Sequence, residues 1–310
     1  MDTPLETNRA IRSVALIGLG AIGTLYAAKI AGRDSACLRI IADSDRIARL
    51  RADPPTFNGR RLDLQYADPA LPGPPADLIL VAVKSTALST AAAAIAPFLD
   101  ENTQIIPLLN GLTAQDILAV AFGWRRVLYG FVICDSAMRI GHAVVQHGTS
   151  RLVFGEAANA PPSSRVLAVG AGFDRLGVEY EIPADMRAAQ WRKYILNIGL
   201  NQTEALLRLP HGGLQHDPAA MRLARHLMDE AAAIATAMGI DGADQMPAWA
   251  EQTIRKLPPE DKTSMLQDID AGRPPETDLF AETVCRLGRQ FGIPTPANAR
   301  ALELLRPRSG

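Results

Sequence analysis

Three glycines at fixed spacing, close to the start of the chain, constrain its fold more than any other feature. Residues 14–17 form a short apolar run with two β-branched side chains, which is typical of a buried parallel strand. The run leads into Gly18-Leu19-Gly20-Ala21-Ile22-Gly23, which fits the pattern G-x-G-x-x-G. The first glycine permits a tight turn, the second lets a pyrophosphate approach the backbone, and the third lets a helix pack closely on the strand.

The residues after this turn complete the pattern of a dinucleotide-binding unit. Residues 24–32 have the amphipathic pattern of a helix, and the amino-terminal end of such a helix stabilises an anion. A second strand is predicted over residues 37–43, and it ends at Asp43, 20 residues after Gly23. An acid at that distance is suited to the ribose hydroxyls of a dinucleotide. The sequence therefore predicts a dinucleotide site at this turn.

Strands and helices alternate through the first half of the chain, whereas the second half has only helical periodicity. The alternation predicts an α/β fold, a doubly wound Rossmann-type domain over residues 1–183, with residues 1–12 as a disordered lead-in. An all-α domain for substrate binding and dimerisation is predicted over residues 184–310. Further strands are expected at residues 77–84, 103–111, 126–134, 142–149 and 150–157, the last three as antiparallel additions at the sheet edge.

Composition excludes several classes of partner. A chain of 310 residues with a net charge of −1 has room for two cores and no basic field for nucleic acid or anionic lipid. Its apolar runs are too short to span a membrane, and its 3 cysteines, far apart, suggest no disulfide framework. The 5 histidines have no metal-binding spacing. We expect a cytoplasmic protein that binds a small molecule and requires no metal.

Two polar stretches in the second half are candidates for chemistry. Lys193, Asn197 and Asn201 are spaced i, i+4, i+8, so they share one face of a long helix. That face could bind a ligand, or the lysine could extend to solvent while the amides bond to neighbouring helices. Residues 263–278 are rich in polar side chains and place Glu276 near a helix start, as a capping charge or as a catalytic acid.

Taken together, these stretches resemble the ketopantoate reductases (2-dehydropantoate 2-reductases). The resemblance runs from Ser13 to about Leu305. It implies reduction of ketopantoate to pantoate by a nicotinamide cofactor, a step in pantothenate and coenzyme A biosynthesis. The motifs that carry it are the glycine-rich turn, Lys84, Asn110-Gly111, W-R-K-x-x-x-N-x-x-x-N at 191–201, S-M-x-Q-D from Ser264, and G-R-x-x-E-x-D ending at Asp278.

The resemblance also implies roles for individual residues. Lys193 would donate the proton to the substrate carbonyl, and Glu276 would lie close to the reacting centre. The implied substrate-binding residues are Asn110, Lys193, Asn197, Asn201, His211 and Ser264. The implied cofactor-binding residues are Gly18, Leu19, Gly20, Ala21, Ile22, Gly23, Asp43, Arg46, Lys84, Asn110, Ala137 and Glu276.

Several departures from the family pattern leave alternatives open. Asp43 stands where many relatives have a basic residue, which suits NADH, whereas Arg46 could reach the 2′-phosphate of NADPH, the cofactor that family habit favours. His211 replaces an asparagine, so the substrate could be another branched 2-oxo acid. Pro275 and Thr277 flank Glu276 in place of the usual residues. A different class, a non-catalytic redox sensor that binds NAD(P), would need none of the polar residues of the second half. A homodimer is also expected.

Overall fold

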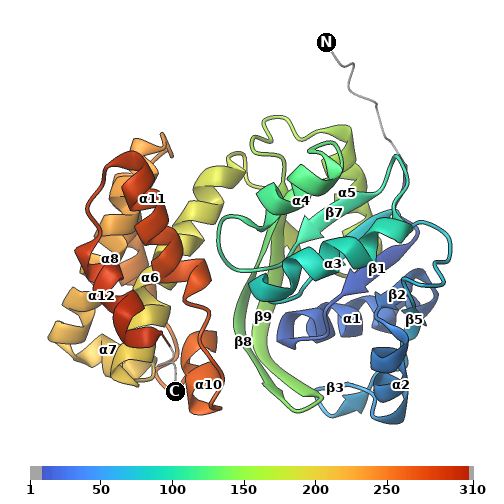
Figure 1. The fold of residues 1–310 in the computed structure, drawn as a ribbon, viewed down its shortest axis with the longest axis horizontal. Helices are drawn as coiled ribbons and strands as arrows, with labels where there is room; N and C mark the ends of the chain where they lie inside the picture. Colours follow the sequence, from blue (N-terminus) through green and yellow to red (C-terminus); the bar gives the residue numbers. More distant parts are fainter. Residues whose placement is uncertain (1–8, 307–310) are drawn as a thin grey trace. The chain divides into compact units, whose positions relative to one another are not determined.

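The structure is a computed structural model that describes residues 9–306. The chain divides into two compact units, Met1–Met186 and Arg187–Gly310, and the predicted boundary after residue 183 lies close to this division. The first unit is built of sheets and helices, and the second is helical (Figure 1). Within the described part of the chain, no helix is both long and apolar enough to cross a membrane.

The first unit contains a sheet of five strands that are all parallel. The strands β2 and β6 lie on opposite sides of β1, so the topology changes direction at β1. This arrangement confirms the doubly wound fold, and in such sheets ligands bind beyond the carboxyl ends of the strands at the change of direction. In spatial order the strands are β5 (Gln65–Ala67), β2 (Leu38–Ile41), β1 (Val14–Ile17), β6 (Leu78–Val81) and β7 (Gln104–Pro107).

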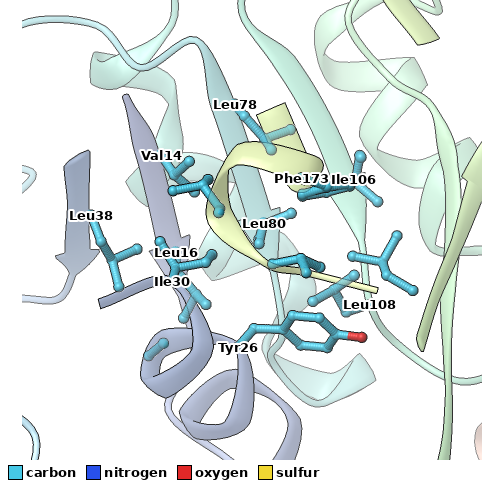
Figure 2. Packing of buried hydrophobic residues seen from close by; sticks show 14 of the residues in the cluster. Val14, Leu16, Tyr26, Ile30, Leu38, Leu78, Leu80, Ile106, Leu108 and Phe173 are labelled. Atoms are coloured by element: carbon cyan, nitrogen blue, oxygen red, sulfur yellow. The ribbon is translucent and has the colours of Figure 1, made fainter. Parts of the chain in front are cut away.

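Helices cover both faces of this sheet, which explains why its central strands are apolar throughout. Alternate side chains of a strand point to opposite faces, so Val14 and Leu16 belong to one core cluster and Ala15 and Ile17 to another. Figure 2 shows the first cluster, in which Tyr26 and Phe173 pack among the strand residues. The first cluster is covered by α1 (Ala21–Asp34) and α5 (Ser164–Leu176), and the second by α3 (Leu88–Ile95) and α4 (Ala114–Phe122).

The later strands of this unit differ from their prediction. They form a second sheet, dominated by the antiparallel pair β8 (Tyr129–Ile140) and β9 (Ala143–Gly155), rather than an extension of the first sheet. The predicted strands 142–149 and 150–157 are one strand, β9. This strand continues past Gly148 (φ +71°) because β8 has a bulge opposite it. At the bulge, the Asp135 carboxylate accepts a hydrogen bond from the Thr149 backbone N–H at 2.7 Å. Three short strands complete this sheet: β3 (Thr56–Phe57), β4 (Arg60–Arg61) and β10 (Tyr180–Glu181).

The sequence predicted that residues 1–12 are a disordered lead-in. This prediction is wrong for residues 9–12, and residues 1–8 lie outside the described residues. Arg9 forms ion pairs with Asp77 and Asp100, each at 2.8 Å. Ile11 is 5% exposed, and the Arg12 backbone N–H donates to Asp77 at 2.9 Å. Residues 9–12 are therefore tied to the first sheet.

The second unit is organised around the helix α8 (Pro218–Ala237), which contacts α7, α9, α11 and α12. Asp217 caps α8 by accepting the Ala219 backbone N–H at 2.7 Å, with a proline in the first turn. A π-helical turn at Asp278–Glu282 precedes α11. The other helices are α6 (Met186–Leu207), α7 (His211–His216), α9 (Met246–Ile254), α10 (Ser264–Asp270), α11 (Thr283–Phe291) and α12 (Pro296–Leu305).

Candidate active site

Two of the three glycines in the first turn are required by the packing of the protein itself. Gly18 has φ +98°, and a Cβ at this position would lie 2.6 Å from the Ala82 carbonyl oxygen, just beyond β6. A Cβ on Gly23 would lie 1.7 Å from the Gly18 carbonyl oxygen. Gly18 therefore permits the turn and its approach to β6, and Gly23 permits α1 to pack against the turn.

Gly20 differs, because nothing in the described protein requires its lack of a side chain. A Cβ on Gly20 would meet no atom within 4 Å, and its φ of −79° is open to any residue. Gly20 is the N-cap of α1, which has no side-chain cap and no acidic residue in its first turn. The open space and the uncapped helix N-terminus fit a pyrophosphate group of a dinucleotide.

The other residues of the G-x-G-x-x-G segment contribute through their backbone. Leu19 is 8% exposed and belongs to the core, and Ile22 packs against the same core cluster. Ala21 is the first residue of α1. The Leu19 and Ile22 side chains thus serve packing, and the N–H groups of this segment are the groups that an anion would meet.

Asp43 has a structural role that the sequence did not reveal. It is the N-cap of the helix α2 (Ser44–Ala52), and its carboxylate accepts the Arg46 backbone N–H at 2.7 Å. Asp43 is exposed and follows β2, at the sheet edge where the glycine-rich turn follows β1. An acid at this position therefore caps a helix, whether or not a ribose also binds to it.

Lys84 and Asn110 lie beyond the carboxyl ends of the strands of the first sheet, as the glycine-rich turn does. Lys84 follows β6 at the N-cap position of a short 3₁₀ turn, and Asn110 follows β7. Because these strands are parallel to β1, their carboxyl ends lie together with the glycine-rich turn. Ala137 lies elsewhere, on β8 of the second sheet, where it pairs with Gln146 of β9.

In the second unit, α6 brings the predicted polar residues onto one face, and their burial increases along the helix. Lys193 and Asn197 are partly exposed, whereas Asn201 is 5% exposed. The Asn201 amide makes no hydrogen bond to any residue among 9–306. A nearly buried amide without an internal partner is suited to a ligand.

The same face of α6 ends in a residue that the sequence analysis missed. Glu204 is fully buried, with 0% exposure. Its Oε1 is in hydrogen-bonding contact with Nδ1 of His211, and its Oε2 accepts the Thr263 backbone N–H at 2.9 Å. Thr263 caps α10 and directly precedes Ser264, which is exposed. One carboxylate therefore links α6 to the segments that carry His211 and Ser264.

Glu276 lies between an ion-paired turn and the π-helical turn. Arg273 donates to the Asp268 carboxylate at 2.7 Å, which closes the turn between α10 and Glu276. Beyond Glu276, the Tyr194 hydroxyl donates to the carbonyls of Leu279 and Phe280 at 3.0 and 3.1 Å. Burial raises the pKa of this hydroxyl above its ordinary value, so it remains a donor. The neighbour of Lys193 on α6 therefore anchors the segment that follows Glu276.

The structure thus groups the predicted residues within each unit. In the first unit, the carboxyl ends of the parallel strands bring together the glycine-rich turn, Asp43, Lys84 and Asn110. In the second unit, the α6 face is linked through Glu204 to His211 and to the start of α10. Glu204 could have been found from spacing, because it lies 11 residues after Lys193 and continues the i, i+4, i+8 face. For Thr263 and Tyr194, the sequence indicates no role beyond helix capping and packing.

A dinucleotide-binding turn on a doubly wound sheet, in one chain with a helical unit that carries a lysine and asparagine face, defines a class of nicotinamide-dependent oxidoreductases. Comparison with known proteins gives the family. The family described as "Ketopantoate reductase PanE/ApbA" matches residues 14–159, and its C-terminal counterpart, "Ketopantoate reductase PanE/ApbA C terminal", matches residues 185–309. The chain belongs to the ketopantoate reductase family.

Individual relatives are similar over almost the whole chain. The 2-dehydropantoate 2-reductase of Mesorhizobium japonicum is 28% identical, over 94% of this chain and 96% of the relative. The crystal structure of 2-dehydropantoate 2-reductase from Geobacter metallireducens GS-15 is also 28% identical, with a TM-score of 0.79 over 94% of this chain and 98% of that one. D-mandelate dehydrogenase, solved with NADH and anilino(oxo)acetate, shares the fold with a TM-score of 0.85 at 18% identity, over 94% of this chain and 97% of that one.

Proposed function

We propose that this protein reduces ketopantoate (2-dehydropantoate) to pantoate with a nicotinamide cofactor. The observation that carries the proposal is the face of α6 on which Lys193, Asn197 and Asn201 lie, within a chain whose two halves both match this family. The face offers an ammonium group and two amides, which suit a small molecule with a carboxylate, a ketone and a hydroxyl. A non-catalytic redox sensor would have no use for such a face.

Each residue then has a physical task. Reduction of a ketone develops negative charge on its oxygen, and the Lys193 ammonium stabilises that charge and donates the proton that completes the alcohol. Asn197, Asn201 and Ser264 hold the carboxylate and hydroxyl groups of the substrate, and Glu276 lies near the reacting centre. A bound reduced nicotinamide supplies the hydride.

The first unit binds this cofactor, and we assign NADPH as the preferred form. The backbone of Gly18–Gly23 holds the pyrophosphate, while Lys84, Asn110 and Ala137 contact the remainder. The Asp43 carboxylate already serves as a helix cap, so its presence alone does not indicate NADH. Arg46 is partly exposed on the first turn of α2, and its guanidinium suits a 2′-phosphate.

A second substrate class has one specific observation in its favour. His211 stands where the family pattern has an asparagine, and it is engaged by a buried glutamate rather than facing solvent. An imidazole is larger than an amide and offers different hydrogen bonds. Another branched 2-oxo acid is therefore the alternative substrate.

The test is a steady-state assay of nicotinamide oxidation with a panel of 2-oxo acids. We expect kcat/KM to be highest for ketopantoate with NADPH. A higher kcat/KM for 3-methyl-2-oxobutanoate, which lacks the hydroxyl group, would support the alternative substrate. Cofactor binding with no oxidation by any member of the panel would contradict the assignment as a reductase.

A further inference from the structure

The buried carboxylate of Glu204 needs an explanation, because removing a carboxylate from water is costly unless it is paired. Glu204 has 0% exposure, yet both of its oxygens have partners. Oε2 accepts the Thr263 backbone N–H at 2.9 Å, and Oε1 contacts Nδ1 of His211. The pair joins α6 to the first residue of α7 and to the cap of α10.

The backbone around His211 is held as firmly as its ring. The His211 N–H donates to the Asp261 carbonyl at 3.0 Å, and the Gly212 N–H donates to the Pro259 carbonyl at 2.8 Å. The His211 side chain is 7% exposed. The backbone is therefore fixed by these bonds, and the buried ring by its contact with Glu204, which Nδ1 faces.

The remaining ring nitrogen, Nε2, makes no hydrogen bond to any residue among 9–306. Its protonation follows from the charge of the buried pair. If Glu204 is ionised and His211 protonated, both ring nitrogens carry protons. If the proton instead lies on Glu204 and is donated to Nδ1, the neutral ring carries its own proton on Nε2. Both of these electrically neutral arrangements make Nε2–H a donor. An ionised Glu204 beside a neutral ring that is protonated on Nδ1 would instead leave Nε2 an acceptor, at the cost of a buried net negative charge.

We infer that Glu204 is a positioning residue that fixes His211 as a hydrogen-bond donor, through Nε2–H, to an oxygen of the substrate. This inference rests on the proposed function, since it needs a substrate on the α6 face. An asparagine side chain can both donate and accept, whereas a histidine with its proton on Nε2 can only donate from that nitrogen. The site therefore selects a substrate that presents an oxygen acceptor at this point.

Kinetics of a double-variant cycle test whether Glu204 acts through His211. The variants are Glu204→Met, which removes both hydrogen bonds at similar length, His211→Asn, and the two combined. We expect Glu204→Met to raise the KM for ketopantoate about tenfold, as the loss of one hydrogen bond would. We expect kcat and the cofactor Kd to change less than about threefold. In the His211→Asn background, Glu204→Met should change KM no further.

Two more variants separate this role from general stability. Glu204→Gln should keep the KM close to its wild-type value. The glutamine amide can accept from Thr263 and donate to Nδ1, which leaves Nε2–H in place. Glu303→Gln, which removes an exposed carboxylate paired with Arg300 at 2.6 Å, is the matched control and should have no effect. A KM unchanged by Glu204→Met, or effects that multiply in the combined variant, would overturn the inference.

A measurement independent of turnover keeps the inference separate from the proposed function. The ¹⁵N chemical shifts of the histidine rings report which nitrogen carries a proton, and comparison with His211→Asn identifies the signal of His211. We expect Nε2 of His211 to be protonated in the wild-type protein, and its signal to shift when ketopantoate is added. An unprotonated Nε2 would refute the inference even if the enzyme is active. A protonated Nε2 whose signal shifts with ketopantoate, without turnover of any 2-oxo acid, would refute only the proposed function.

The same measurements identify which substrate oxygen receives the bond. If Glu204→Met raises KM equally for ketopantoate and for 3-methyl-2-oxobutanoate, the acceptor lies on the part that both share, the 2-oxo acid group. If only ketopantoate is affected, the acceptor is its hydroxyl. An effect on neither substrate would contradict a contact between His211 and substrate.

Discussion

Gly20→Ala should separate cofactor binding from folding, because the structure gives the three glycines of the turn different tasks. A methyl group on Gly20 meets no protein atom within 4 Å, and the backbone is already in an ordinary conformation. Alanine is a poorer N-cap than glycine by about 0.5–1 kcal/mol. It also restricts the unfolded chain, which stabilises the protein by about 0.4–1 kcal/mol. These effects nearly cancel, so the melting temperature should hardly change.

Cofactor affinity should respond very differently. The added methyl group would occupy the space through which the pyrophosphate approaches the backbone. Loss of one hydrogen bond to a charged group is worth about 1.5–3 kcal/mol, which corresponds to an increase of about ten- to a hundredfold in Kd. Titration of the reduced cofactor by fluorescence measures this Kd, and thermal unfolding of the cofactor-free protein measures the stability.

Gly18→Ala is the matched comparison, and in this variant the stability of the protein should fall. Its φ is +98°, and the new methyl group would lie 2.6 Å from the Ala82 carbonyl oxygen, so any side chain there is strained. The conformational penalty alone is about 1–2 kcal/mol, which lowers the melting temperature by about 2–8 °C. Wild-type cofactor affinity in Gly20→Ala, or a loss of stability as large as that of Gly18→Ala, would refute the assignment of Gly20 to the cofactor.

Four single substitutions give further predictions. Lys193→Ala should lower kcat by about two to four orders of magnitude, with cofactor Kd unchanged, as expected for a positioned acid; near-normal turnover would remove Lys193 from the mechanism. Arg46→Ala should weaken the binding of NADPH about tenfold or more and leave the binding of NADH unaffected. Asp43→Asn, which keeps the helix cap, should weaken the binding of NADH. Equal losses of affinity for both cofactors in Arg46→Ala would show that Arg46 does not contact the phosphate. Tyr194→Phe should lower the free energy of unfolding by about 1–2 kcal/mol, measured in urea, because two buried carbonyls lose their donor; an unchanged free energy would show that these bonds contribute nothing net.

Local pattern was sufficient for the core of the first unit. The strand at Val14–Ile17 and the turn after it follow from apolar runs and glycine spacing, and both are where the sequence places them. The second sheet was not predictable in the same way, since its strand β9 continues through Gly148 only because β8 bulges opposite it. A bulge is a property of paired strands that neither strand shows alone. The short strands β3, β4 and β5 carry too few residues for any periodicity to be visible.

The candidate site was predictable where its residues share one helix. The α6 face followed from spacing alone, but the link from Glu204 to His211 and Thr263 joins three segments that the chain brings together only on folding. Asp43 illustrates the converse, because its acid fits a ribose-binding motif while the structure shows it capping α2. The contacts of Ala137, the homodimer and the cytoplasmic location stay predictions.

Transfer of a labelled hydride tests the central claim most directly. The protein would be incubated with ketopantoate and NADPH that carries deuterium at both C4 positions of the nicotinamide, and the product would be examined by mass spectrometry and NMR. We expect pantoate with deuterium at C2, formed at a rate that Lys193→Ala reduces sharply. Unlabelled pantoate, or no pantoate while the cofactor remains bound and reduced, would contradict the account.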